Sequence, residues 1–167
     1  MLYSNDNGLR AFDLVKQTES TLSNQHATII ETNSFNEDIL AIAGDSKICI
    51  LDHRTRTTIC DATVNNPVTG FDWNPLVPYW CTVQSSSSIS IHDVRVSLEA
   101  PVREYKESFL KTFTWSNANC DLFLTSTMDQ SVCLWGLGSD KCHSRVTFAK
   151  TGGTLTSSTY SPHKVTV

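Results

Sequence analysis

Short stretches of alternating apolar and polar residues recur along the chain, and each ends in a bulky residue followed by aspartate or glycine. Four of them read GLRAFDL, KICILDH, SISIHDV and SVCLWGL. Their bulky positions are Phe12, Leu51, His92 and Trp135, which are spaced by 39, 41 and 43 residues. Successive side chains of a β-strand point to opposite faces, so this alternation predicts strands with one buried face.

A turn-forming residue precedes most of these strands by a constant distance. Asp6, Asp45, Ser86 and Asp129 each lie six residues before a bulky position. Aspartate and serine favour tight turns, so each of these residues is expected to close a hairpin with the preceding strand. The serine run 85–88 is read in the same way, with a phosphorylation site as the alternative.

A second series keeps the same period and points to an internal repeat. Its members are Trp73-Asn74-Pro75, Trp115-Ser116-Asn117 and Tyr160-Ser161-Pro162, spaced by 42 and 45 residues, and each ends a strand and enters a turn. Two markers with one common period predict a repeat with room for four short strands. The expected strands are 27–31, 38–43, 47–52, 57–62, 67–73, 79–84, 88–93, 101–106, 109–115, 121–127, 131–136 and 143–148. Helical periodicity is absent, so the chain is expected to be all-β.

These repeats resemble the WD-repeat family, in which each repeat of roughly 40 to 45 residues forms one four-stranded blade of a β-propeller. The best copies are FDWNPLVPYWCTVQSSSSISIHDVR and FTWSNANCDLFLTSTMDQSVCLWGL. The resemblance implies a single partial propeller over residues 1–167. Complete blades are expected at 23–63, 64–106 and 107–150, with partial blades at 1–22 and 151–167.

About four blades' worth of sequence leaves open how the ring closes. Propellers must close to remove their edge strands, and they typically have roughly 4 to 8 blades. The chain is expected to be part of a longer propeller. Two alternatives are closure with blades from a second copy or a partner, and a small ring that joins the two terminal half-blades.

The match to the family is incomplete at its polar positions. The family often joins Asp, Ser or Thr, His and Trp in a hydrogen-bonded tetrad, and only Thr127, Asp129 and Trp135 are available for one here. Asp45, Trp73 and Trp115 are the other structural positions of the repeat. Because the tetrad histidine is missing, the blades are expected to depend on apolar packing and to have modest stability.

A shared pattern after two successive repeats suggests a partner. Asp52-His53-Arg54 and Asp93-Val94-Arg95 both read D-x-R. Such boxes resemble the motif by which WD-repeat substrate receptors bind the adaptor of cullin-4 ubiquitin ligases. An arginine at a strand end projects from the rim and can bind carboxylates or carbonyls. The alternative is that Asp and Arg finish the strand and bridge locally.

Composition narrows the classes of function. Hydrophobic residues make up 40% of the chain and charged residues 18%, with a net charge of −4, which is typical of a folded protein and gives no basic surface for nucleic acid. Apolar runs are too short for a membrane span, and the first residues lack the apolar core of a secretory signal. A cytoplasmic or nuclear location is expected.

No residue pattern predicts catalysis, a metal or a cofactor. His53 and His92 adjoin aspartates, but neighbours along a strand point to opposite faces. The six cysteines contain no C-x-x-C pair and are interpreted as small buried hydrophobes, and Cys142-His143 lacks further ligands at metal spacing. A propeller enzyme would need clustered acids, histidines or metal ligands. The sequence therefore predicts a non-catalytic scaffold or adaptor that binds other proteins, with a cullin-4 substrate receptor as the alternative.

Overall fold

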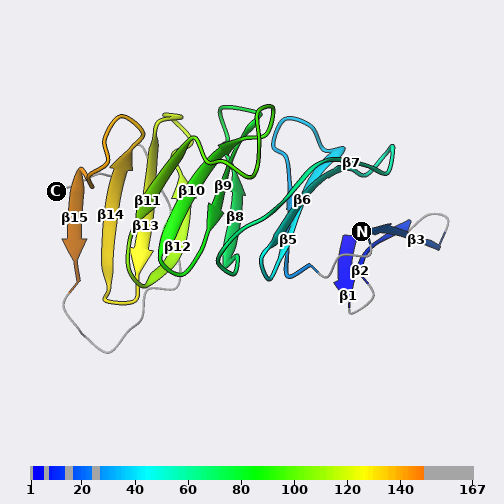
Figure 1. The fold of residues 1–167 in the computed structure, drawn as a ribbon, viewed down its shortest axis with the longest axis horizontal. Coiled ribbons are helices and arrows are strands. Elements are labelled where there is room, and N and C mark those ends of the chain that lie inside the picture. The colour runs from blue at the N-terminus through cyan, green and yellow to red at the C-terminus, as the bar shows by residue number, and fades with distance from the viewer. Residues whose placement is uncertain (1, 6–7, 14–16, 24–26, 149–167) are drawn as a thin grey trace.

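The computed structural model describes residues 2–5, 8–13, 17–23 and 27–148 (Figure 1). In that part of the chain the regular structure consists of β-strands joined by turns and loops. It contains no helix that could cross a membrane. The expected all-β class is confirmed.

Twelve of the strands form three antiparallel sheets with the same meander order, in which each strand pairs with the next along the chain. Blade 1 consists of β4 (Ile29–Thr32), β5 (Ile39–Gly44), β6 (Lys47–Asp52) and β7 (Thr57–Thr63). Blade 2 consists of β8 (Gly70–Trp73), β9 (Trp80–Gln84), β10 (Ser88–Asp93) and β11 (Arg103–Lys106). Blade 3 consists of β12 (Leu110–Trp115), β13 (Leu122–Thr127), β14 (Ser131–Gly136) and β15 (Ser144–Thr147).

A fourth, three-stranded sheet precedes blade 1. It contains β1 (Leu2–Asn5), β2 (Gly8–Asp13) and β3 (Thr18–Ser23) in the order β1-β2-β3. By the repeat, β2 corresponds to β6, β10 and β14, so this sheet matches a blade that enters at its second strand. The partial blade expected at 151–167 lies outside the described residues.

The blades stack face to face in chain order (Figure 1). The first strand of each blade lies beside the first strand of the next, since β8 contacts both β4 and β12. This arrangement of four-stranded meanders is a partial β-propeller with three complete blades.

Two apolar layers fill the spaces between blades. The first layer, between blades 1 and 2, is mostly aliphatic and contains Ala41, Ala43, Ile48, Ile50, Ala62, Val68, Phe71, Trp73, Cys81, Val83 and Leu98. The second layer, between blades 2 and 3, is rich in rings and contains Ile89, Ile91, Tyr105, Leu110, Trp115, Phe123, Cys133 and Trp135. Each layer takes one face of two neighbouring sheets, as the alternation of apolar residues requires.

Candidate interaction surface

The two D-x-R segments lie at the same place on neighbouring blades, where the third strand ends and the turn to the fourth begins. Asp52 Oδ1 accepts hydrogen bonds from the backbone N–H groups of Arg54 (2.9 Å) and Thr55 (3.0 Å). Asp93 Oδ1 accepts one from the backbone N–H of Arg95 at 3.0 Å. Both aspartates therefore close a turn, and hydrogen bonds hold the pKa of each carboxyl below its usual value, chiefly the Thr55 N–H at Asp52 and the Arg95 side chain at Asp93.

Both arginines are held by a neighbouring group yet remain exposed. Arg54 Nε donates to Asp38 Oδ2 at 3.0 Å, and the Arg54 side chain is 69% exposed. Arg95 forms a two-pronged contact with Asp93, at 3.0 Å from Nε and 2.6 Å from Nη2, and its side chain is 58% exposed. The Arg95 guanidinium also lies 3.3 Å from the centre of the Tyr79 ring.

The two guanidinium groups thus occupy equivalent sites. Asp38 directly precedes β5, and Tyr79 directly precedes β9. One arginine pairs with the residue at that position through a carboxylate and the other through an aromatic face. In blade 2 the arginine bridges the aspartate of its own D-x-R segment, whereas in blade 1 the Arg54 side chain pairs with Asp38 instead of Asp52, and both guanidinium groups remain exposed.

Blade 3 has no arginine at this place. Gly136-Leu137-Gly138 stands where D-x-R stands in the other two blades. A Cβ at Gly136 would lie against the end of the His143 imidazole, so a side chain here requires that ring to move. The arginine-bearing edge is therefore confined to blades 1 and 2 among the described blades.

Asparagine side chains tie the loops of this edge from one blade to the next. Asn74, which is fully buried, accepts the backbone N–H groups of Leu76 (2.9 Å) and Val77 (3.0 Å), and its Nδ2 donates to Cys120 O in blade 3 at 3.0 Å. Asn33 does the same in blade 1, and its Nδ2 donates to Pro78 O in blade 2 at 2.8 Å. These latches fix neighbouring loops relative to one another.

Sequence reasoning used Asn74 only as a turn marker and did not find Asn33. The available signal was spacing: Asn33 and Asn74 are 41 residues apart, as are Leu51 and His92. Ser116 takes the equivalent place in blade 3, where its hydroxyl accepts the N–H groups of Ala118 (3.2 Å) and Asn119 (3.1 Å).

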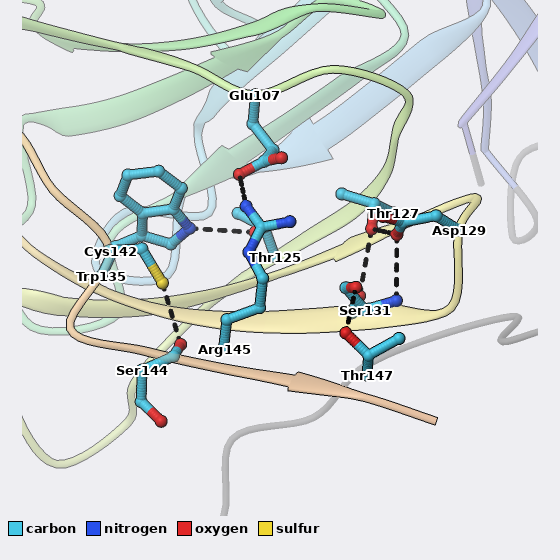
Figure 2. A network of polar contacts seen from close by, with 10 residues as sticks. All are labelled: Glu107, Thr125, Thr127, Asp129, Ser131, Trp135, Cys142, Ser144, Arg145 and Thr147. Carbon is cyan, nitrogen blue, oxygen red and sulfur yellow. Dashed lines mark hydrogen bonds and ion pairs between the residues drawn. The ribbon is translucent and has the colours of Figure 1, made fainter. Parts of the chain in front are cut away.

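The polar residues expected to form one tetrad in blade 3 form two separate groups (Figure 2). Trp135 Nε1 donates to Thr125 Oγ1 at 3.0 Å, so Thr125 and not Thr127 is the partner of the indole. Thr127 Oγ1 instead donates to Asp129, which also accepts the Ser131 N–H at 3.1 Å. The expectation of a single set is corrected because Thr127 lies at the strand end, where its hydroxyl reaches the hairpin turn.

The remaining structural positions occupy a turn and the two layers. Asp45 is exposed in the β5–β6 turn with φ of 51°, a value that aspartate tolerates better than most residues, and its carbonyl accepts the Val68 N–H at 2.6 Å. Trp73 is buried in the first layer, and Trp115 in the second. Residues 85–88 form a hydrogen-bonded turn in which Ser85 Oγ accepts the Ser88 N–H at 3.0 Å.

The histidines considered for acid–base work are not paired with their neighbouring aspartates. His92 Nε2 lies 2.9 Å from Ser90 Oγ, whereas Asp93, on the other face of the strand, binds Arg95. His53 Nε2 is 3.9 Å from Asp38 Oδ1. Within the described residues no three His, Cys, Asp or Glu side chains gather closely enough to hold a metal ion.

Comparison with known proteins supports the fold and leaves the partner open. No family model and no curated protein matches the sequence. A chain in the solved structure titled "Crystal Structure of Mitotic Checkpoint Complex" is similar, with a TM-score of 0.77 and 14% identity over 98% of this chain. This chain spans 50% of that one. Because 935 solved chains match, the shared fold does not select among partners.

Proposed function

We propose that this chain is a WD-repeat propeller segment that serves as a non-catalytic scaffold or adaptor, binding other proteins within a multiprotein complex. The observation that carries the proposal is the edge of blades 1 and 2, where Arg54 and Arg95 are exposed beside loops that Asn33 and Asn74 tie to the next blade. The structurally similar chain comes from a structure whose title describes a multiprotein complex.

The geometry of this edge suits recognition of carboxylates or carbonyls. Guanidinium groups present several N–H donors in a fixed plane and bind such oxygens through paired hydrogen bonds. Arg95 is already oriented by Asp93 and the Tyr79 ring, so less side-chain freedom is lost when a partner binds. An acidic or carbonyl-rich partner segment is the expected occupant.

Quantitative affinity purification tests this proposal. Partners that co-purify with the tagged chain are expected to be lost on combined Arg54→Ala and Arg95→Ala substitution. The matched control removes two exposed lysines, Lys47→Ala with Lys141→Ala, and so changes the net charge equally. Recovery of the same partners with both double variants would contradict a role for this edge.

A cullin-4 substrate receptor is the second candidate. It is favoured by one observation, the presence of two D-x-R segments at equivalent places on adjacent blades. Purified ligase adaptor should then bind the chain and lose affinity on combined Arg54→Ala and Arg95→Ala substitution. Adaptor binding that is absent, or unchanged in the double variant, would contradict the receptor proposal but not the general scaffold proposal.

A further inference from the structure

A polar groove opens between blades 1 and 2 and runs along β10 and β11, from the loop between β7 and β8 to the β10–β11 loop, which also holds Arg95. One part is a cavity of about 310 Å³ whose wall includes His92, Ser88 and Glu104. A second hollow of about 440 Å³ shares Asn66, Ser88 and Glu104 with it, so the two are continuous. The groove is large enough for an extended side chain and part of its backbone.

Two substitutions at facing positions distinguish this layer from the filled one beside it. In β-sheet register His92 pairs with Cys81 as Trp135 pairs with Phe123, so His92 stands where blade 3 has Trp135. Ala62 pairs with Ile48 as Tyr105 pairs with Ile89, so Ala62 stands where blade 2 has Tyr105. A pair of small residues thus replaces a Tyr–Trp contact, and space is left near the groove.

His92 presents a hydrogen-bond acceptor to this groove. The residue is 2% exposed and lines the cavity, and its Nδ1 has no hydrogen-bond partner among the described residues. Ser90 Oγ lies 3.3 Å from Val83 O and donates to it, so the same hydroxyl must accept from His92 Nε2 at 2.9 Å. From this pair of contacts we assign the proton to Nε2 and a lone pair to Nδ1.

The environment keeps this imidazole neutral. Burial lowers the pKa of His92, and the nearby Ser97 carbonyl opposes the shift only in part. A neutral imidazole with a bare nitrogen at the floor of a groove recognises an N–H donor.

Carboxylates at the mouth specify the charge of that donor. Glu99 and Glu104 both line the groove and are exposed, and within residues 27–148 neither forms an ion pair. Lys106, also exposed, lies farther along. Glu107 is neutralised by Arg145, whose Nη2 lies 2.5 Å from its Oε2 (Figure 2). The mouth of the groove beside Glu99 and Glu104 therefore carries negative charge.

We propose that this groove binds a basic segment of a partner protein, with an arginine or lysine head between Glu99 and Glu104 and one of its N–H groups donating to His92 Nδ1. The proposal rests on the scaffold function above and adds to it a second contact site of opposite charge. A partner with both acidic and basic segments could then engage both sites on the same pair of blades.

The test uses a fluorescein-labelled peptide of alternating arginine and glycine, titrated by anisotropy against the full chain at about 0.15 M salt to screen long-range attraction. A glutamate–glycine peptide is the charge control. The arginine peptide is expected to bind and the glutamate peptide not to bind. Combined Glu99→Gln and Glu104→Gln substitution is expected to weaken binding about tenfold.

A matched double variant separates the groove from general charge effects. Glu37→Gln with Asp121→Asn removes two exposed carboxylates outside the groove and is expected to leave affinity unchanged. His92→Leu is expected to weaken binding about threefold while the chain stays folded. Absence of binding to the unmodified chain, or equal weakening by both double variants, would overturn the proposal.

Failure here is distinguishable from failure of the scaffold function. Combined Arg54→Ala and Arg95→Ala substitution should abolish capture of partners by the D-x-R segments but leave arginine-peptide binding intact. If that variant loses the peptide as well, the groove is not an independent site and the proposal is wrong.

Discussion

The two layers between blades use equivalent positions of the repeat for different ends. In the second layer Tyr105, Phe123 and Trp135 form a mesh of rings, with Tyr105 edge-on to both others at 5.1 and 5.5 Å and Phe123 stacked on Trp135 at 6.2 Å. In the first layer the positions of Tyr105 and Trp135 are taken by Ala62 and His92, and Phe71–Trp73 is the ring pair found there.

This difference shows how a repeat can vary its function without changing its fold. The strands of both blade pairs keep the same register, because alternation and backbone pairing set it. The side chains that fill the layer are free to vary so long as enough apolar area is buried. The second layer therefore stabilises the stack through its rings, and the first keeps a polar groove beside a mostly aliphatic core.

Truncation of the tryptophan in the second layer is expected to give the largest difference in stability between the two layers. Trp135 is 4% exposed and contacts two rings. Trp135→Ala should lower the free energy of unfolding by about 4 kcal/mol, and His92→Ala at the equivalent position by about 1 kcal/mol. Urea unfolding followed by far-UV circular dichroism measures both. Equal losses would show that the two layers do not differ in packing.

Removal of the Asn74 side chain is expected to give the next largest loss of stability. Asn74→Ala removes three hydrogen bonds, one of them across the second layer to Cys120 O, and should cost about 3 kcal/mol in the same assay. Ser116→Ala serves as the control because Ser116 caps only its own turn, and it should cost about 1 kcal/mol. A loss at Asn74 no larger than at Ser116 would argue against an inter-blade role.

The pKa of Asp72 tests how far solvent is excluded from the side of the second layer where this carboxyl lies. It lines a hollow of about 210 Å³ with Lys111 and Thr112, and burial, aided by the Glu31 charge, raises its pKa to about 6. The folded pKa exceeds the unfolded value, so the folded state takes up a proton first, and this group adds stability as pH falls from about 7 to 4.

Asp72→Asn should therefore raise the free energy of unfolding at pH 7 by about 2 kcal/mol and give no such gain at pH 4. The difference between variant and unmodified chain isolates this residue from Asp52 and Asp93, whose lowered pKa values act in the opposite direction below about pH 4. A difference independent of pH would mean that Asp72 is well solvated.

The smallest expected effect comes from substitution of His92 in the first layer. His92→Leu replaces a buried ring with an unpaired Nδ1 by the residue type that blade 1 has at the same position, Leu51. The free energy of unfolding should rise by about 1 kcal/mol. Destabilisation instead would assign His92 a structural role and weaken its assignment to binding.

Alternation predicted the central strands of each blade well. The ranges 47–52, 88–93 and 131–136 match β6, β10 and β14, because these third strands carry the clearest pattern of apolar positions. The range 67–73 was too long: β8 begins at Gly70, because Pro67 has no N–H to donate and the Val68 N–H donates to Asp45 O of blade 1.

The functional surfaces were only partly predictable. The D-x-R repeats mark Arg54 and Arg95, but their holding groups, Asp38 and Tyr79, differ chemically and share only a place in the fold. The groove could not be predicted from the sequence, because His92 stands at a repeat position where tryptophan is expected. Its proposed role in binding depends on Ala62, Glu99 and Glu104, which come near His92 only when the two blades stack.

The most direct test of the contrast between the layers is a nuclear magnetic resonance titration of the ¹⁵N-labelled chain with the arginine–glycine peptide. Shifts are predicted to gather at Ser88, His92, Glu99 and Glu104, with a change at the His92 Nδ1 resonance as its lone pair accepts a hydrogen bond. Shifts confined to the D-x-R edge or to blade 3, with the His92 ring unchanged, would contradict the assignment of the first layer to binding.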